Sequence, residues 1–313
     1  MNDCFDRTIR YLRLSVTERC NYRCVYCMGE GDGPRRARGD LLSVDELCEI
    51  GAAAVRCGVD KIRLTGGEPL VRRDILTLCE RLRALRALDE LALTTNGSLL
   101  PAMADGLRRA GVDRLNVSLD TLRPERFRAV TRRGALADVL DGLDAAKRAG
   151  FADVKLNVVL LGGVNDDEIP AFVALTGDEA LCVRFIELMP MGVCAAFPRE
   201  RFLSADAVLR AVPTLVPAGR DGVAELYRAP GHRGTVGLIR PLSRCFCPSC
   251  DRLRVTADGR LKPCLHSSAE LDLRGLHGAA LEDAIRRGAA MKPERHHLQS
   301  GSDTPRTMNR IGG

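Results

Sequence analysis

The sequence predicts an α/β protein in which parallel strands and helices alternate to form an incomplete barrel. Between residues 10 and 190, short strand-like runs alternate with longer stretches of helical periodicity. Glycines follow several helical stretches, at positions where helices commonly end. Six strand–helix units in series favour one parallel sheet with helices outside, an incomplete (β/α)6 barrel. Beyond Pro190 the alternation breaks, and a less regular module is expected.

The predicted elements follow in chain order. Strands are expected at 10–16, 61–65, 91–95, 114–119, 154–160 and 182–188. Helices are expected near 43–57, 71–87, 99–110, 134–149 and 167–176. The first helix has a capping-box start, Ser43 with Glu46, and Gly58, Gly111 and Gly150 lie where C-caps belong. We therefore expect a partial barrel over residues 1–190 and a C-terminal domain over residues 191–313.

The composition bounds the class of protein. A chain of 313 residues, 45% hydrophobic and 28% charged, is typical of a soluble globular protein. It has no apolar run long enough to span a bilayer and no signal-peptide segment, so we expect a cytoplasmic protein without a membrane partner. In a reducing cytosol, its thirteen cysteines would bind metals or lie in cores. Only 4% aromatic residues and no Trp argue against nucleic acid, and a net charge of +6 favours a small anionic ligand.

One face of the predicted strands is polar or basic. Side chains alternate along a strand, so residues two apart share a face. The residues that follow this pattern are Tyr11, Arg13, Ser15, Lys61, Arg63, Thr65, Arg114, Asn116, Ser118, Lys155, Asn157 and Arg184. Any one of them alone could be a strand-end residue that reaches solvent. Because five strands repeat the pattern and unpaired buried cations are costly, the interior is expected to bind a polyanion.

A first cysteine triplet, Cys20, Cys24 and Cys27, directly follows the first predicted strand. Three thiolates on one tight loop can ligate three irons of a four-iron cluster and leave the fourth iron open to substrate or cofactor. A disulfide is disfavoured because the number is odd and the loop is short. Zinc would need a fourth Cys or His nearby, and none follows before Cys48. The spacing therefore favours an open iron–sulfur cluster over a structural metal.

The motif Thr65-Gly66-Gly67-Glu68-Pro69 directly follows the predicted strand 61–65. Alone it could be an ordinary strand-to-helix turn, but two glycines leave the backbone open to close approach by a ligand. The triplet followed by this motif resembles the radical S-adenosylmethionine (SAM) enzymes. In that superfamily the open iron chelates the methionine end of SAM, and reduction yields a 5′-deoxyadenosyl radical. The resemblance implies a [4Fe-4S] cluster and SAM as cofactors.

A second triplet, Cys247, Cys250 and Cys264, lies near the C-terminus. His266 could complete a zinc site, so the spacing alone leaves zinc and iron–sulfur open. Cys245 is a spare candidate ligand, although its Cys-x-Cys spacing beside Cys-x2-Cys favours a place next to the site. The remaining histidines show no ligand spacing to the cysteines and are expected in surface or loop roles: His232, His277, His296 and His297.

The segment 243–265 is similar to the auxiliary-cluster region of the GTP 3′,8-cyclase family, which performs the first step of molybdenum cofactor biosynthesis. The similarity also covers segments 12–20, 63–73, 94–97, 116–120, 155–158 and 184–187 and the terminal glycines. It implies a second [4Fe-4S] cluster on Cys247, Cys250 and Cys264. It also implies cyclisation of GTP to 3′,8-cyclo-7,8-dihydroguanosine 5′-triphosphate, with the 5′-deoxyadenosyl radical abstracting the ribose 3′ hydrogen. The partners implied are GTP, a reductant protein such as flavodoxin or ferredoxin, and downstream cyclic pyranopterin monophosphate synthase, with the chain a monomer or homodimer.

Position by position, the resemblance assigns three groups of residues. The SAM contacts it implies are Tyr26, Gly67, Ser118 and Met189. The GTP contacts it implies are Arg13, Lys61, Arg63, Thr94, Lys155, Arg184, Arg252, Leu253 and Arg254. The catalytic residues it implies are Arg13, Gly312 and Gly313, the glycines reaching into the pocket; without the resemblance, a frayed tail is the default. A triphosphate of about four negative charges suits such a set, because Arg offers forked donors to phosphate.

Two other functions stay open. A radical SAM enzyme that modifies peptides could also carry an auxiliary cluster, but it usually has more C-terminal cysteines and needs no cationic interior. A non-catalytic metal-binding or scaffold protein would leave the Gly-Gly-Glu-Pro motif and the polar strand faces unexplained.

Overall fold

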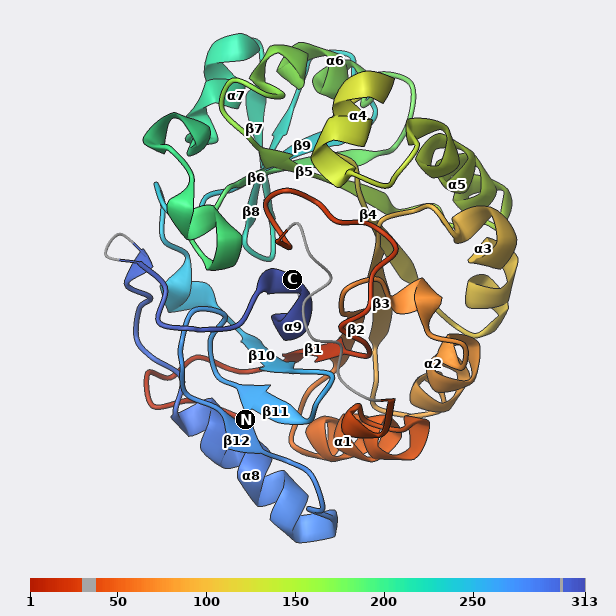
Figure 1. Cartoon of the computed structure of the whole chain (residues 1–313), viewed down its shortest axis with the longest axis vertical. Helices are drawn as coiled ribbons and strands as arrows, with labels where there is room; N and C mark the ends of the chain where they lie inside the picture. Colours follow the sequence, from red (N-terminus) through yellow and green to blue (C-terminus); the bar gives the residue numbers. More distant parts are fainter. Residues whose placement is uncertain (30–37, 299–300, 313) are drawn as a thin grey trace.

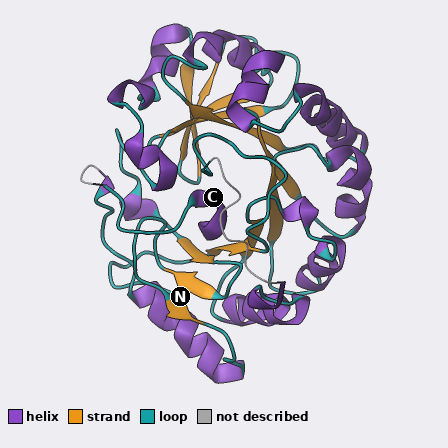
Figure 2. Ribbon diagram, in the orientation of Figure 1, coloured by secondary structure: helices purple, strands orange, loops and turns teal. Residues whose placement is uncertain are grey.

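The computed structural model describes residues 1–29, 38–298 and 301–312. One sheet of twelve strands forms its frame, in the order β12-β11-β10-β1-β2-β3-β4-β5-β6-β9-β8-β7. The sheet curves around a central space that holds the C-terminal residues (Figure 1). Helices surround the strands on the outside, as Figure 2 shows.

The first six strands are parallel neighbours in chain order. They are β1 (Tyr11–Ser15), β2 (Lys61–Thr65), β3 (Glu90–Thr95), β4 (Arg114–Ser118), β5 (Val154–Leu160) and β6 (Cys182–Glu187). The helices between them are α1 (Val44–Arg56), α2 (Ile75–Arg83), α3 (Leu100–Arg109), α4 (Pro124–Thr131), α5 (Leu136–Arg148) and α6 (Ile169–Ala174). The predicted α/β partial barrel is therefore confirmed, and α4 is an element that the sequence analysis missed.

The C-terminal part extends this sheet at both edges. β9 (Thr235–Ile239) lies parallel to β6, and β10 (Arg252–Val255) lies parallel to β1. Antiparallel strands continue outward: β8 (Ala224–Arg228) and β7 (Val216–Asp221) beyond β9, and β11 (Arg260–Lys262) and β12 (Leu271–Asp272) beyond β10. The remaining helices are α7 (Asp206–Ala211), α8 (Gly278–Ala290) and α9 (Met308–Ile311). Strands from both sides of residue 190 belong to the same sheet. The division into domains at 1–190 and 191–313 therefore stays a prediction.

The local signals for α1 act as predicted. Glu46 N donates to Ser43 Oγ (3.2 Å) and Ser43 N donates to Glu46 Oε2 (2.8 Å), so both halves of the capping box form. The three predicted C-cap glycines all have positive φ: Gly58, Gly111 and Gly150. In the part of the chain that the structure describes, no helix has the length and apolar character needed to cross a membrane.

The core lies between the strands and the outer helices. Leu12, Leu14, Ile62 and Leu64 are at most 2% exposed and belong to one apolar cluster that includes Leu47 of α1. Since side chains alternate along each strand, the polar residues between them face the interior of the barrel. The interior is therefore lined by the polar set that the sequence predicts.

Candidate active site

The first triplet lies on the loop that leaves the carboxyl end of β1. Val25 N donates to Val130 O of α4 (2.9 Å), which ties the middle of the loop to that helix. Cys27 N donates to Cys24 O (3.0 Å), so the loop turns back on itself. Tyr22 N donates to the Cys20 sulfur (3.3 Å). The three thiols therefore gather at one end of the barrel.

These thiols are neutral without a metal. Burial raises the pKa of Cys20 to about 11 and that of Cys27 to about 12, and it raises the pKa of Cys24 well above its usual range. A bound metal must therefore stabilise the thiolates. Among the described residues, the three sulfur atoms do not form a group with all members within 4.8 Å of one another. Donors to a single zinc ion would be about 3.8 Å apart, so the wider spacing fits an iron–sulfur cluster better.

Gly67 holds the loop of the first triplet against the end of β2. Its N–H donates to Thr17 O (2.8 Å), and a Cβ at this position would lie 2.5 Å from Arg19 O. Only glycine fits so close to another backbone. From the sequence, the space beside Gly66 and Gly67 was expected to admit a ligand. In the structure, the backbone between β1 and Cys20 fills the space beside these glycines. Contact between Gly67 and SAM stays a prediction.

Glu68 joins the loops that follow β2 and β3. It is 1% exposed and accepts hydrogen bonds from Leu70 N (3.0 Å), Thr95 Oγ1 (2.8 Å) and Asn96 N (2.7 Å). Burial raises its pKa to about 7, although these donors oppose the shift. Asn96 Nδ2 in turn donates to Asn21 Oδ1 (2.8 Å), next to Cys20. Glu68 thus helps to fix the loop of the first triplet.

The predicted SAM contacts lie at the same end of the barrel as the first triplet. Gly67 follows β2, Ser118 ends β4, Met189 follows β6, and Tyr26 belongs to the triplet loop. Parallel strands bring their carboxyl ends to one edge, which is where α/β sheets place ligands. The fold therefore gathers these four positions on one rim.

Asp120 is a rim residue that the sequence analysis did not assign. Tyr26 Oη donates to Asp120 Oδ2 (2.6 Å), and Val159 N donates to Asp120 Oδ1 (2.8 Å). Burial raises the pKa of Asp120 to about 6. Its place directly after a strand end was the available signal. Asp120 fixes the Tyr26 ring beside the first triplet.

The cations of the interior are neighbours across adjacent strands. Arg13 on β1 is in register with Arg63 on β2 and with Arg254 on β10. Lys155 and Arg184 stand on the neighbouring strands β5 and β6. Arg63, Lys155, Arg184 and Arg254 are each at most 8% exposed. The structure therefore brings predicted GTP contacts from five strands into one buried region.

Burial and mutual repulsion weaken the protonation of these cations. Burial and the neighbouring Arg254 lower the pKa of Arg13 well below its usual range. Burial and Arg252 lower the pKa of Arg254 to about 10. The Nε atoms of Arg63, Arg184 and Arg252 are buried without a hydrogen-bond partner among the described residues, and Asp251 Oδ1 lies 4.0 Å from Arg252 Nε. Such donors fit an anionic ligand.

Three other predicted GTP contacts differ in their surroundings. Thr94 Oγ1 is buried without a hydrogen-bond partner in the described ranges. In this respect it is like the Nε atoms of the three buried arginines. Lys61 Nζ is paired with Glu90 Oε1 (2.8 Å). Leu253 is 1% exposed and lies in the apolar core, in register with Leu12. Its side chain therefore faces away from the cations, which leaves only its backbone for a ligand contact.

Asp221 is the counter-ion that the sequence analysis missed. Its Oδ2 accepts hydrogen bonds from Lys155 Nζ and from Arg184 Nη2. Burial opposes ionisation, but the bond from Lys155 and the charge of Arg184 lower the pKa of Asp221 to about 2. Asp221 ends β7, which the sequence did not mark as part of the sheet. The Asp221 carboxylate thus binds the two cations, Lys155 and Arg184, that could also bind a phosphate group.

The C-terminal tail lies inside the barrel. Gly312 O accepts from Arg254 Nη1 (2.8 Å), and Asn309 Nδ2 donates to Glu18 O (3.1 Å) near the first triplet. Gly312 has φ +84°, and a Cβ there would lie 2.8 Å from the Cβ of Ser15. Figure 1 shows α9 in the centre of the ring of strands. Gly313 lies outside the described residues.

The second triplet lies at the opposite end of the same strands. Cys250 directly precedes β10, which begins beside the start of β1, and Cys264 follows β11. Lys292 Nζ joins them by donating to Arg252 O (2.9 Å) and Pro263 O (3.1 Å). Burial opposes ionisation of Cys250, but the charges of Lys292 and Arg252 lower its pKa. The buried cations therefore lie between two sets of thiols.

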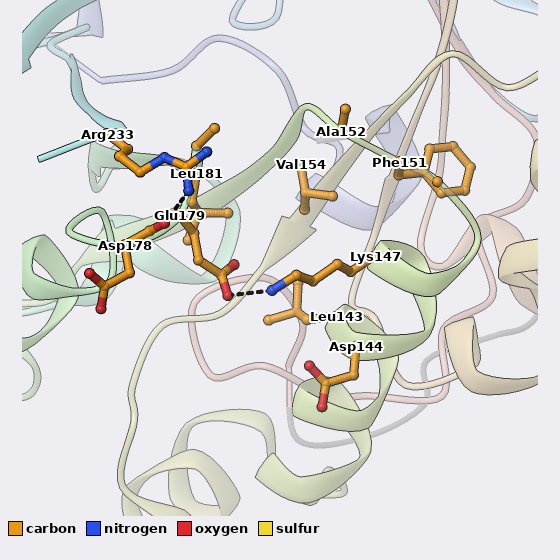
Figure 3. A pocket seen from close by; sticks show the side chains of 12 residues that line it. Leu143, Asp144, Lys147, Phe151, Ala152, Val154, Asp178, Glu179, Leu181 and Arg233 are labelled. Atoms are coloured by element: carbon orange, nitrogen blue, oxygen red, sulfur yellow. Dashed lines mark hydrogen bonds and ion pairs between the residues drawn. The ribbon is translucent and has the colours of Figure 1, made fainter.

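A pocket on the outside of the barrel contains none of the predicted site residues. It lies between α5 and the segment before β6, where Lys147 Nζ donates to Glu179 Oε1 (2.7 Å) (Figure 3). Arg233 Nη1 donates to Asp178 O (3.1 Å) at its edge. This pocket is therefore separate from the candidate active site.

Two family matches together cover most of the chain. Residues 14–176 match the Radical SAM superfamily, and residues 181–298 match the family described as Molybdenum Cofactor Synthesis C. A protein named GTP 3′,8-cyclase from Peptoclostridium acidaminophilum is 47% identical, covering 99% of this chain and 98% of that protein. Proteins of the same name from Alkaliphilus metalliredigens and Moorella thermoacetica are each 44% identical, with both chains fully covered.

Solved structures agree with the fold. SuiB from Streptococcus suis has a TM-score of 0.62 at 13% identity, covering 90% of this chain and 68% of SuiB. Methylornithine synthase (PylB) has a TM-score of 0.55 at 16% identity, covering 94% of this chain and 85% of that chain. These identities show the barrel alone, whereas the full-length relatives define the family. The chain belongs to the GTP 3′,8-cyclase family within the radical SAM superfamily.

Proposed function

We propose that this protein cyclises GTP to 3′,8-cyclo-7,8-dihydroguanosine 5′-triphosphate, the first step of molybdenum cofactor biosynthesis. The observation that carries the proposal is full-length similarity to curated GTP 3′,8-cyclases. The buried cations between the two triplets support it, because a nucleoside triphosphate needs such a lining.

Two [4Fe-4S] clusters and SAM are the cofactors of this reaction. Cys20, Cys24 and Cys27 would hold one cluster, and Cys247, Cys250 and Cys264 the other. When bound, the reduced first cluster and SAM would supply the 5′-deoxyadenosyl radical that takes the ribose 3′ hydrogen. Bonding of C3′ to guanine C8 would leave a radical on the purine, which one further electron from the reductant and one proton would convert to the dihydro product. The proposed SAM contacts are Tyr26, Gly67, Ser118 and Met189. Asp120 would hold Tyr26 in place through its hydrogen bond.

The interior cations would bind the triphosphate. Their guanidinium groups are desolvated and repel one another, so a bound polyanion relieves both costs. The buried Nε donors of Arg63, Arg184 and Arg252 would find acceptors on phosphate oxygens. The phosphates would displace the Asp221 carboxylate from Lys155 and Arg184.

The tail would complete the wall around the reacting ribose. Gly312 is held by Arg254 and packs on Ser15 and Thr65 without room for a side chain. A wall of backbone this close positions the substrate and excludes water from a radical. On the family resemblance we assign catalytic roles to Arg13, Gly312 and Gly313, and these contacts support the role of Gly312.

Several partners follow from the chemistry of the reaction. Reductive cleavage of SAM consumes an electron, so we propose a reductant protein such as flavodoxin or ferredoxin. The product would pass to cyclic pyranopterin monophosphate synthase in the cytoplasm. We propose a monomer or homodimer as the active form.

Product identification tests the function. Reduced protein with both clusters is incubated with SAM and, separately, with GTP, ATP, CTP or UTP. Because the cyclisation product has the mass of GTP, separation by chromatography must precede mass spectrometry. We expect a new compound from GTP alone, formed together with 5′-deoxyadenosine. Deoxyadenosine formation without any new nucleotide would contradict the proposal and favour the alternative, a radical SAM peptide-modifying enzyme.

A further inference from the structure

A third group of metal-binding side chains lies beside the second triplet. The sulfur atoms of Cys245 and Cys247 and a ring nitrogen of His296 all lie within 4.8 Å of one another. No other such group of three Cys, His, Asp or Glu donors occurs in the described ranges. From the sequence, Cys245 was a spare candidate ligand, whereas His296 was expected in a surface or loop role because it is far from both cysteines along the chain. That interpretation is corrected here for His296, which the fold brings to the cysteines.

A buried arginine builds this juxtaposition. Arg7 is 8% exposed, and its Nη1 donates both to Cys247 O (2.9 Å) and to Glu294 O (3.1 Å). Its Nη2 donates to Pro293 O (2.7 Å), and Asp3 neutralises its charge. The backbone of Cys247 is thereby fixed to the segment that carries His296. Arg7 therefore holds the segment of Cys247 and the segment of His296 together.

The donor set and its spacing fit one ion. Zinc takes tetrahedral Cys and His ligands at about 2.3 Å and 2.0 Å, which places donor atoms about 3.8 Å apart. The three donors need only a small adjustment to reach this spacing. The ring of His266, which is 8% exposed, lies 5.3 Å from the ring of His296. His266 Nδ1 is buried without a hydrogen-bond partner among the described residues, so it is available as a fourth donor.

We propose that Cys245, Cys247 and His296 bind a single zinc-type divalent ion, with His266 completing the site. Binding Zn²⁺ releases the protons of the two thiols. Exposed Cys245 gives the ion a path from solvent. Because Cys247 belongs both to this group and to the second triplet, zinc and the auxiliary cluster exclude each other. This exclusion rests on the proposed function, whereas the zinc site itself does not.

Zinc affinity of the full-length, iron-free protein tests the site. The substitutions Cys20→Ser, Cys24→Ser and Cys27→Ser first remove the other thiol triplet, which would compete for zinc. Circular dichroism verifies that this variant is folded. In this background, Zn²⁺ affinity is measured against a chromogenic chelator, and Co²⁺ reports thiolate ligation by its absorption. We expect Cys245→Ser and His296→Ala each to weaken zinc binding at least about 100-fold, and the matched control Cys264→Ser to change it less than about threefold. If Cys264→Ser weakens binding as much as Cys245→Ser, or if the background binds no zinc, the site is wrong.

Competition during cluster assembly tests the exclusion. One equivalent of Zn²⁺ added before reconstitution should lower iron from about eight to about four per chain, while Cys245→Ser should keep about eight. Unchanged iron in the zinc-treated protein would overturn the exclusion. Without zinc, Cys245→Ser should still cyclise GTP. If neither the unsubstituted protein nor Cys245→Ser cyclises GTP, the proposed function is contradicted, but the measured zinc affinities still test the zinc site. Failure of the function and failure of the zinc site are therefore distinguishable.

Discussion

The two cysteine triplets use the same donors, but only in the second do neighbouring cations bring the pKa of a thiol below its ordinary value. The first lies at the carboxyl end of β1, where burial raises its thiol pKa values and the carboxylates of Glu68 and Asp120 add to the shift. The second lies at the amino end of β10, where Lys292 and Arg252 lower the pKa of Cys250, whereas burial raises the pKa of Cys247 to about 12. Strands β1 and β10 are parallel neighbours, so the same pair of strands separates the triplets.

The cations beside Cys250 indicate which charge that end of the interior favours. Cationic surroundings stabilise thiolates and bound anions, whereas a buried neutral pocket gives no such help. Arg13, Arg63 and Arg254 lie along the strands between the two ends. In the proposed function, the second triplet holds the negatively charged substrate beside these cations, and the first serves SAM.

The sharpest test of the comparison removes one triplet at a time. Cys24→Ser should abolish both 5′-deoxyadenosine formation and cyclisation, because the first cluster is lost. Cys264→Ser should lose only the auxiliary cluster and still cleave SAM. Each variant should retain about four irons per chain. Iron analysis and chromatography of deoxyadenosine give the answer, and equal loss of SAM cleavage in both variants would contradict the separation of roles.

The next largest effect concerns the cations between the triplets. Arg254→Ala removes a charged donor and should weaken GTP binding by about 1.5–3 kcal/mol, or about 10- to 100-fold. Arg252→Ala should act in the same direction. Both clusters should still assemble, which iron analysis verifies, and Arg254→Lys should restore part of the affinity. Equilibrium dialysis with GTP measures the change; unchanged binding in both alanine variants would remove these residues from the substrate site.

The tail offers a test near the first triplet. Gly312→Ala places a Cβ 2.8 Å from Ser15 Cβ, in a backbone conformation with φ +84° that favours glycine. Cyclisation should fall about 10- to 100-fold because the reacting groups are displaced, while GTP affinity and thermal stability change little. Single-turnover product formation and GTP binding, measured side by side, separate these effects. Full activity of the variant would show that the tail has no part in positioning.

The smallest predicted effect concerns Asp221. Asp221→Asn removes an anion that competes with phosphate for Lys155 and Arg184, so GTP should bind about two- to fivefold more tightly, as expected for a partly exposed ion pair. The lowered pKa, about 2, means that the carboxylate is ionised above about pH 4. Its contribution to stability is present there and is lost only as pH falls toward 2. The ratio of the two affinities should therefore be constant between about pH 6 and pH 8. Weaker GTP binding by the variant would mean that Asp221 orients the cations instead of competing for them.

The barrel could be predicted because its signals are local. Each of the first six strands has its own alternating pattern, and α1 has its capping box between Ser43 and Glu46. The inward direction of Arg13 and Arg63 follows from alternation alone. Both triplets were visible as spacings, although only the resemblance favoured iron over zinc for the second.

The rest depends on contacts that no local pattern encodes. Nothing near Arg252 indicates that β10 pairs with β1 at the other end of the chain. Asp221 meets Lys155 and Arg184 only because β7 and β8 are added to the sheet after β9. His296 reaches Cys247 through Arg7, a residue from the N-terminus. The helix α4 is different, because Pro124 at its first position is a local signal for the start of a helix.

One measurement addresses the central claim that the second triplet holds the substrate while the first serves SAM. Electron–nuclear double resonance with ¹⁵N-labelled GTP detects contact between a reduced cluster and the guanine. We predict a ¹⁵N coupling in the Cys24→Ser protein, which keeps only the auxiliary cluster, and none in Cys264→Ser. A coupling confined to Cys264→Ser would contradict the account.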